Sequence, residues 1–285
     1  AWRVNTHGGP EQGLVLEDGI PEPEPAADQV RIRVGAAALN FGDDLLCRGT
    51  YQLRPELPFT PGLEVAGEVV AAGPDAGIEL GTRLMAVPAL PWGGLAECAL
   101  ADARNCYPVP ASMPDDEAAA MLIPFQTGHV ALHRRGGLAA GETLLVHAGA
   151  GGVGSAAIQL AKRRGAHVTA VTSPGKADNL RALGADTILA RDEALPADAF
   201  DVVLDLVGGP GWPQVLDALD LRGRYVTSGA IAGPIVELDL RTLYLKDQTL
   251  IGSTRQEPRV FTDLVGYIES GEIRPVMFRS FDLAE

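Results

Sequence analysis

The sequence is poor in cysteine and contains no long apolar run. Only Cys47, Cys98 and Cys106 occur among 285 residues. So sparse and odd a set argues against a disulfide framework and favours a reducing compartment. No stretch reaches the roughly eighteen apolar residues of a transmembrane helix, and residues 1–4 lack the basic start of a signal peptide. We therefore expect a cytoplasmic protein without a membrane partner.

Positive charge is also scarce. The chain has 23 Lys and Arg residues against 37 Asp and Glu residues, which gives a net charge of −14. A field of that sign repels nucleic acid and anionic lipid, so neither is an expected partner, and any bound phosphate needs local donors and cations. Hydrophobic residues make up 46% of the chain, which is typical of a globular protein with a packed core.

The first part of the chain is predicted to be rich in β-strands. Segment 29–34 alternates polar and apolar residues, and segments 64–70 and 81–87 are two further candidate strands. Gly67 indicates a bulge or a close approach of the backbone within the second of them. Prolines and glycines separate the segments, and this punctuation favours a barrel-like unit.

The pattern changes near Pro114. Residues 115–117 are acids, which the first turn of a helix favours, and the alanine-rich stretch after them predicts a helix to about Leu132. Beyond it we expect strands over 143–147, 167–172, 186–189, 200–206 and 224–227, and helices over 154–164, 176–183 and 214–219. This alternation predicts an α/β domain with a doubly wound parallel sheet.

A glycine-rich turn, Ala148-Gly149-Ala150-Gly151-Gly152-Val153-Gly154, joins the first of these strands to its helix. A small residue at 148 allows the tight turn, Gly151 lets a diphosphate approach the backbone, and Gly154 lets the helix pack closely. The N–H groups of the first helical turn then face the phosphates. The predicted cofactor contacts are Ala148, Gly151, Gly152, Val153 and Gly154. The alternative is a purely structural turn.

The end of the next strand indicates which dinucleotide binds. An NAD site usually has an acid there, which binds the ribose diol. This chain instead has Thr172, Ser173 and Lys176, which suit a 2′-phosphate, and Arg191 could add a second cation after the following strand. We therefore predict NADPH rather than NADH, the alternative being that Lys176 is only a solvated charge at a helix start.

Several segments together resemble the medium-chain dehydrogenase/reductase superfamily, and specifically its zinc-free quinone oxidoreductase (zeta-crystallin-like) branch. They are 39–43, 62–67, 126–128, 147–154, 183–186 and 205–209. The resemblance implies a Rossmann domain plus a GroES-like β-barrel catalytic domain. The implied domains are 1–115 for the GroES-like domain, 116–255 for the NADP-binding domain, and 256–285 for a segment returning to the first, which stops before the family's last helix and strand.

The same resemblance argues against a metal. Zinc-dependent relatives hold their catalytic zinc with cysteine, histidine and cysteine, and the matching positions here are Asn40, Leu63 and about Ile123. These are not a plausible zinc ligand set. The cysteine-rich lobe that holds a structural zinc in those relatives is also missing, so we expect no zinc.

The family also implies roles for residues away from the glycine-rich turn. The expected contacts on the nicotinamide side are Asn40, Thr127, Val207, Gly229 and Ala230. Tyr51 matches a tyrosine near the substrate in this branch and is our candidate proton or hydrogen-bond donor, with a packing aromatic as the alternative. His147 is expected to be structural. His129 and His133 share a helix face but lack a third metal ligand.

Without a Lewis acid, a conjugated acceptor is the favoured substrate, because conjugation carries the negative charge to an oxygen after hydride arrives at carbon. We therefore expect an NADPH-dependent reductase of a hydrophobic quinone or α,β-unsaturated carbonyl. Two alternatives remain open: an enoyl-thioester reductase, possibly a synthase module, and a non-catalytic NADPH-binding protein. The apolar segment 249–252 favours a homodimer formed through a sheet edge.

Overall fold

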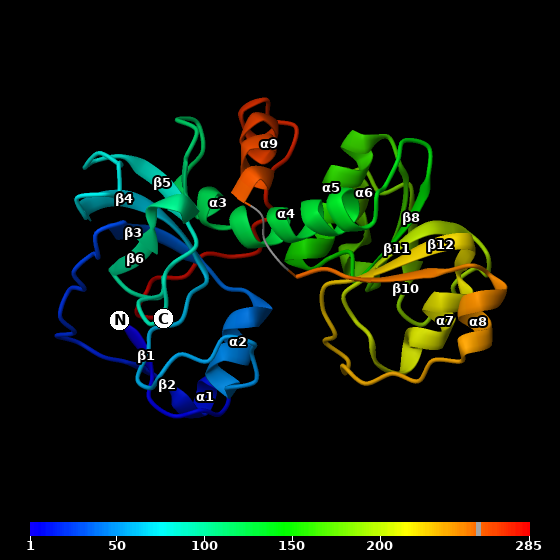
Figure 1. Ribbon diagram of the computed structural model, residues 1–285, viewed down its shortest axis with the longest axis horizontal. Helices are drawn as coiled ribbons and strands as arrows, with labels where there is room; N and C mark the ends of the chain where they lie inside the picture. The colour runs from blue at the N-terminus through cyan, green and yellow to red at the C-terminus, as the bar shows by residue number, and fades with distance from the viewer. Residues whose placement is uncertain (255–257) are drawn as a thin grey trace. The chain divides into compact units, whose positions relative to one another are not determined.

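The computed structural model covers residues 1–285. It describes all of them except residues 255–257, and it does not describe the side chains of residues 258, 259 and 262. The chain divides into two compact units, residues 1–123 with 277–285, and residues 124–276 (Figure 1). The first unit continues beyond the expected domain limit at residue 115, because a helix over 115–119 packs on its strands. The domain limits after 115 and 255 themselves stay predictions.

The first unit is built on a five-stranded antiparallel sheet with the order β6-β3-β4-β5-β7. Its strands are β3 (Gln29–Ala38), β4 (Glu64–Ala72), β5 (Arg83–Ala86), β6 (Cys98–Asp102) and β7 (Cys106–Pro108), and β1 (Trp2–Val4) pairs separately with β2 (Leu14–Leu16). The helices are α1 (Pro10–Gly13), α2 (Phe41–Arg48) and α3 (Asp115–Ala119), with a 3-10 turn η1 (Ala103–Asn105).

The alternation expected for 29–34 decides which side chains enter the core of this unit. Val30 and Ile32 are fully buried, whereas Arg33 reaches outward to Glu68. Gly67 lies beside a register shift in β3, and a Cβ on it would fall 2.1 Å from the carbonyl oxygen of Arg33. The close approach predicted from this glycine is therefore confirmed.

The single helix expected from residue 115 to about 132 is wrong. The segment is divided into α3, α4 (Leu122–His129) and a π-helical stretch η2 (Val130–Arg135). Pro124 lies in the first turn of α4, where its missing N–H costs nothing, but it could not continue a helix arriving from α3. The break leaves the N–H of Ile123 to donate to a side chain, Glu64.

The second unit carries a six-stranded parallel sheet with the order β10-β9-β8-β11-β12-β13. The strands are β8 (Thr143–His147), β9 (His167–Thr172), β10 (Thr187–Ala190), β11 (Phe200–Asp205), β12 (Leu219–Thr227) and β13 (Thr249–Gly252). The expected α/β class and doubly wound sheet are confirmed. The strand order reverses between β8 and β11, and dinucleotides bind at such a switch point.

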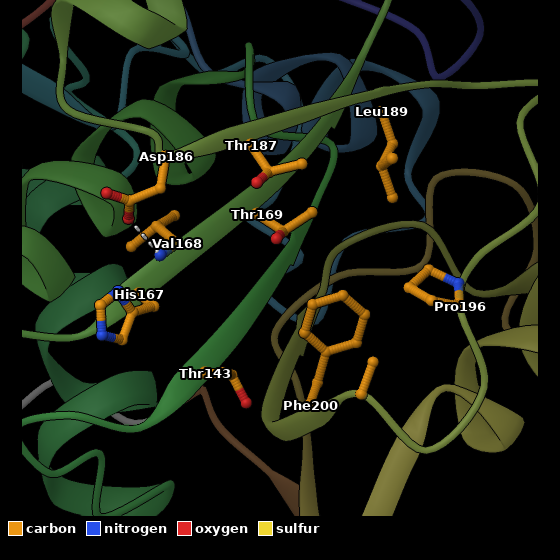
Figure 2. Close-up of a pocket in the computed structure, with 10 residues that line it drawn as sticks. Thr143, His167, Val168, Thr169, Asp186, Thr187, Leu189, Pro196 and Phe200 are labelled. Carbon is orange, nitrogen blue, oxygen red and sulfur yellow. Dashed lines mark hydrogen bonds between the residues drawn. The ribbon is translucent and has the colours of Figure 1, made fainter.

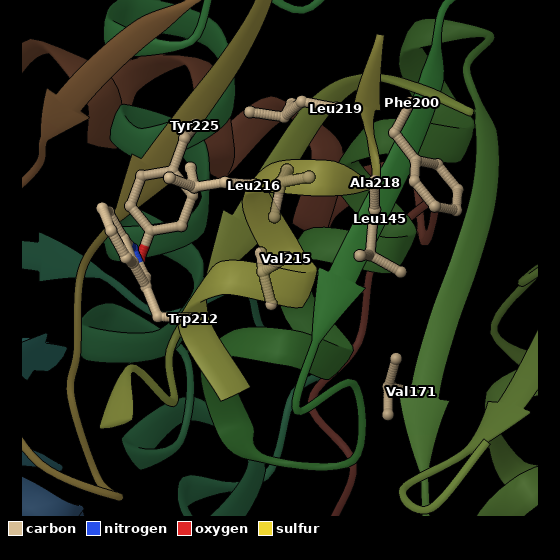
Figure 3. Close-up of a cluster of buried hydrophobic side chains, with 10 residues drawn as sticks. Leu145, Val171, Phe200, Trp212, Val215, Leu216, Ala218, Leu219 and Tyr225 are labelled. Carbon is tan, nitrogen blue, oxygen red and sulfur yellow. The ribbon is translucent and has the colours of Figure 1, made fainter. Parts of the chain in front are cut away.

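Helices cover both faces of this sheet (Figure 1). They are α5 (Gly152–Arg164), α6 (Ala177–Ala182), α7 (Trp212–Asp217) and α8 (Leu240–Leu245). The unit also contains α9 (Pro258–Glu269) and the 3-10 turns η3 (Pro174–Lys176) and η4 (Gly209–Gly211). No helix among the described residues is both long and apolar enough to cross a membrane. Figure 3 shows the core beneath α7, where Trp212 meets Tyr225 edge to face at 6.1 Å between ring centroids.

The connection from β10 to β11 is unusual, since residues 191–199 contain neither helix nor strand. Parallel crossovers normally need a dozen or more residues and a helix. A pocket remains on the sheet beside this short connection, lined by residues that include Thr143, Thr169, Thr187 and Phe200 (Figure 2). These residues are the first residues of their strands or lie close to them. The pocket therefore lies at the amino ends, opposite the glycine-rich turn.

Candidate functional site

The glycine-rich turn directly follows the carboxyl end of β8 and is tight, as its small residues suggest. Ala148 has a φ of 76°, a left-handed value rare outside glycine. A Cβ on Gly154 would fall 2.2 Å from the carbonyl oxygen of Ala148, and one on Gly149 would fall 2.9 Å from the Cβ of Ala170. Only glycine therefore lets α5 begin this close to the turn.

The N-terminus of α5 is open to a ligand. Gly151 is its extended N-cap, and both Gly151 and Gly152 are exposed. The first N–H groups of a helix have no acceptor within it and carry the positive end of the dipole, so this terminus suits a diphosphate. Pro124 of α4 lies 3.3 Å from where a Cβ on Gly152 would stand. Thr127 is three residues further along α4 and shares that face.

The residues proposed for the 2′-phosphate meet at two neighbouring strand ends. Thr172 ends β9 and pairs with Ala190, the last residue of β10. Ser173 and Arg191 directly follow these two strand ends, and Arg191 and Lys176 are both exposed. The hydroxyl of Thr172 is buried and has no hydrogen-bond partner in the structure. A ligand hydroxyl or phosphate at this edge would supply that missing partner.

Val207 lies beside the turn that contains Gly229 and Ala230. The N–H of Ala232 donates to the carbonyl of Val207 at 2.9 Å, and the Cβ of Ala230 lies 3.4 Å from where a Cβ on Gly208 would stand. The structure thus brings together these two predicted parts of the nicotinamide site, at the carboxyl ends of β11 and β12.

Asp205, the last residue of β11, organises this edge. Its carboxylate is fully buried and accepts hydrogen bonds from His147 Nδ1 at 2.9 Å, Tyr225 Oη at 2.7 Å and the Val207 N–H at 2.8 Å. Burial alone would raise the pKa of Asp205, but the bonds from His147, Tyr225 and Val207 hold it below its usual value. The site therefore contains a buried, ionised carboxylate.

The sequence reading did not assign a role to Asp205 or Tyr225. Asp205 directly follows the apolar run 202–204, and that position could have indicated a buried acid. A buried acid needs several hydrogen-bond donors, so a role in holding the site together could have been predicted. Tyr225 lies within β12 and gave no comparable signal.

Asn40 and Tyr51 belong to the other unit. Asn40 is the N-cap of α2, and its backbone N–H donates to Asp43 at 2.9 Å. Its side-chain Nδ2 donates to Glu64 Oε1 at 2.8 Å, and Glu64 Oε2 accepts from the N–H of Ile123 at 2.8 Å. The carboxamide of Asn40 is thus held from the β4 side by a buried carboxyl group.

Neither Glu64 nor Asp43 was among the predicted site residues. Burial raises the pKa of Glu64 to about 8 against the opposing bonds from Ile123 and Asn40, and burial raises the pKa of Asp43 to about 6. Glu64 is therefore mainly protonated at neutral pH. It gave no signal in the sequence because it reads there as an ordinary polar position of an alternating strand.

Tyr51 is half-buried against an apolar cluster that includes Leu46, Phe59 and Leu63. Its ring lies 3.4 Å from where a Cβ on Gly42 would stand. Burial raises the pKa of Tyr51 further above its already high usual value, so the phenol keeps its proton at neutral pH. The packing role is visible, and the donor role stays a prediction.

The three positions that match zinc ligands in relatives have no zinc-binding chemistry here. Leu63 belongs to the apolar cluster, Ile123 packs against it, and the amide of Asn40 is bonded to Glu64. Two alkyl groups and an amide do not fit a zinc ion. The described residues also contain no group of three or more His, Cys, Asp and Glu side chains placed to hold a metal.

His129 and His133 form a separate cluster. Their rings meet at 4.8 Å between centroids, beside Arg134, Arg163 and Asp263. Burial, the other histidine and the arginines lower the pKa of His133 to about 4. Burial also lowers the pKa of His129, so neither ring is expected to carry a charge at neutral pH.

Known proteins resemble the chain over both units. Residues 26–111 match the family "Alcohol dehydrogenase GroES-like domain", and residues 152–270 match "Zinc-binding dehydrogenase". A quinone oxidoreductase of Rattus norvegicus is 32% identical over 99% of this chain and 90% of its own length. An acryloyl-coenzyme A reductase of Sulfurisphaera tokodaii is 30% identical over 94% of this chain and 89% of its own.

A solved structure adds a bound cofactor to these similarities. A mycobacterial protein in complex with NADPH matches with a TM-score of 0.84 and 30% identity, over 96% of this chain and 89% of that one.

Proposed function

Because the chain belongs to the medium-chain dehydrogenase/reductase superfamily, an oxidoreductase group, we propose that it transfers hydride from NADPH to a quinone or an α,β-unsaturated carbonyl, without zinc. The observation that carries this proposal is the glycine-rich turn, which opens the N-terminus of α5 at the point where the strand order reverses. That arrangement suits a diphosphate between adenosine and nicotinamide.

The residues present fit NADPH. Gly152 and Val153 would hold the diphosphate through their N–H groups, and Gly151, whose own N–H donates to the carbonyl of Ala148, would let it approach the backbone. Ser173, Lys176 and Arg191 would hold the 2′-phosphate, and the buried hydroxyl of Thr172 lacks a partner at the same edge. The NADPH complex of the similar mycobacterial protein supports this choice. When bound, NADPH supplies the hydride.

The chain's own residues then position the acceptor and its charge. We assign the nicotinamide side to Asn40, Thr127, Val207 and the pair Gly229–Ala230. Tyr51 donates a hydrogen bond, and then its proton, to the oxygen on which negative charge gathers, because its phenol stays protonated at neutral pH. A conjugated acceptor needs no Lewis acid, which agrees with the lack of zinc ligands at Asn40, Leu63 and Ile123.

A second candidate is the reduction of an enoyl thioester. The similarity to an acryloyl-coenzyme A reductase favours it. A long phosphopantetheine arm needs room and cations, and the sequence shows no clear basic track for one. The chain could serve such a reaction alone or as a synthase module, and a binding-only protein is the third candidate.

One turnover assay separates the three candidates. NADPH oxidation is followed with a panel of quinones, 2-alkenals and crotonyl thioester, with and without a zinc chelator. We expect oxidation with a quinone or alkenal that the chelator does not slow. Preference for the thioester favours the second candidate. No turnover, together with a higher Tm in NADPH, favours binding only.

We also propose a cytoplasmic homodimer. All three cysteines are free, which suits a reducing compartment. Strand β13 forms one edge of the parallel sheet, and Leu250 and Ile251 lie on it half-buried. An open edge of this kind can pair with a second copy. Light scattering that reports a monomer would contradict the dimer.

A further inference from the structure

The carboxylate of Asp205 has no part in the proposed reaction, yet it lies at the strand-order reversal. It is fully buried and stands at the carboxyl end of β11, between β8 and β12. Its Oδ1 accepts from His147 on β8 and its Oδ2 from Tyr225 on β12. One side chain therefore joins three neighbouring strands at the edge where the dinucleotide is proposed to bind.

The same carboxylate shapes the turn that follows β11. The N–H groups of Val207 and Gly208 both donate to it, at 2.8 Å and 3.2 Å. Gly208 has a φ of 60°, and a Cβ on it would fall 2.8 Å from the carbonyl oxygen of Gly233. The turn is thus held in a left-handed conformation that has little freedom to relax.

The groups around position 205 are hydrogen-bond donors, so few side chains other than a carboxylate would suit that position. Burial raises the pKa of Tyr225, and so does its bond to the carboxylate, so the phenol remains a donor. Tyr225, Val207 and Gly208 all require an acceptor, and His147 is bonded through Nδ1. An amide in place of the carboxylate would turn an NH2 group toward some of these donors.

We propose that Asp205 is a positioning residue for the nicotinamide half of bound NADPH, acting through the turn Val207–Gly209. This inference rests on the proposed function, since it assigns Val207 to the nicotinamide side. The adenosine half depends on other residues, Thr172, Ser173 and Lys176, which end or follow β9. Loss of the carboxylate should therefore weaken binding of the whole dinucleotide but not of its adenosine half.

The chain offers a matched control on the same strand. Asp201 lies near the amino end of β11, and its carboxylate accepts from the N–H and the hydroxyl of Thr143, both at 2.8 Å. It also braces β11 against β8, but at the end of the sheet away from the turn.

The experiment compares the Kd values of NADPH and of 2′,5′-ADP, by calorimetry on the full chain. For Asp205→Asn we expect the Kd of NADPH to rise about tenfold while that of 2′,5′-ADP stays within about twofold. Tyr225→Phe keeps the ring packing. For this variant we expect the Kd of NADPH to rise about threefold while that of 2′,5′-ADP again stays nearly constant. Asp201→Asn should lower Tm and leave the ratio of the two Kd values unchanged.

Each other outcome overturns a stated claim. If the unsubstituted protein binds no NADPH, the proposed function fails, and this inference fails with it. Suppose instead that the unsubstituted protein binds NADPH, and that Asp205→Asn and Tyr225→Phe leave the ratio of the Kd of NADPH to the Kd of 2′,5′-ADP unchanged. Only the positioning role then fails. A ratio that changes equally in Asp201→Asn also overturns it, because general loosening of β11 would then suffice. Should Asp205→Asn not fold, Tyr225→Phe alone decides.

Discussion

Glu64 and Asp205 are both buried carboxyl groups, one in each unit, but their charge states differ. Glu64 is 1% exposed and Asp205 is 0% exposed. The pKa of Glu64 is raised to about 8, whereas the pKa of Asp205 is held below its usual value. Burial raises the pKa of both groups, with Glu64 enclosed more deeply among protein atoms, and the surrounding groups differ as well.

The donors explain the contrast. Asp205 accepts from His147, Tyr225 and two backbone N–H groups. Glu64 accepts from Asn40 and Ile123, and the nearby Asp43 raises its pKa further. Glu64 is protonated because burial outweighs its few donors, and Asp205 is ionised because its donors outweigh burial.

Removal of Asp205 should have the largest effect on stability. Asp205→Ala leaves the hydroxyl of Tyr225 and two N–H groups without an acceptor, which should cost about 3 kcal/mol or more. Urea unfolding at pH 7 measures it, and Asp192→Ala, at an exposed position of the same unit, is the control. A loss below about 1 kcal/mol would show that the buried bonds contribute little.

The pH dependence of stability should show the next effect, at Glu64. Its pKa is near 4.3 when unfolded and about 8 when folded. Between these values the folded protein binds more protons, so its stability falls as pH rises. Glu64→Gln should remove on the order of 3 kcal/mol of that fall between pH 5 and pH 8, as measured by urea unfolding. An unchanged slope would mean that Glu64 is ionised in the folded protein.

Asp205 should act at the other end of the pH range. Its folded pKa is lowered, so the stability that it contributes is present above the unfolded pKa of about 3.9 and is lost as pH falls through the folded value. The free energy of unfolding, measured from pH 6 to pH 2, should therefore decline less steeply in Asp205→Asn than in the unsubstituted protein. An equally steep decline would assign the acid sensitivity to other carboxylates.

Tyr225→Phe should give a smaller loss, about 2 kcal/mol, because one hydrogen bond to a charged group is removed while the ring stays against Trp212. Thermal unfolding measures it. Tyr244→Phe, on an exposed ring, is the control and should leave Tm unchanged.

The smallest expected effect tests the charge beside Glu64. Asp43→Asn removes a negative charge that raises the pKa of Glu64, so that pKa should fall toward its usual value. Carbon NMR titration of labelled Glu side chains would detect the change. A constant pKa would leave burial as its sole cause.

Local patterns were sufficient for most of the second unit's framework. The strands expected over 143–147 and 167–172 have those limits in the structure, because apolar runs and flanking turn residues act within a few residues of the chain. Other limits differ: β12 begins at Leu219 rather than 224, and α7 ends at Asp217 rather than 219. The close packing at Gly154 and Gly67 was also readable, since a missing side chain signals a close approach.

The fold class, the glycine-rich turn and the superfamily could be read from the chain before it was folded, because periodicity and short motifs are local properties. Only the tertiary structure brought Tyr225 and His147 onto Asp205, across separations of 20 and 58 residues, and Asn40 onto Glu64 across 24. The charge of a buried acid depends on such distant donors. A single strand carries no record of them, which is why these two carboxyl groups could be told apart only after the chain was folded.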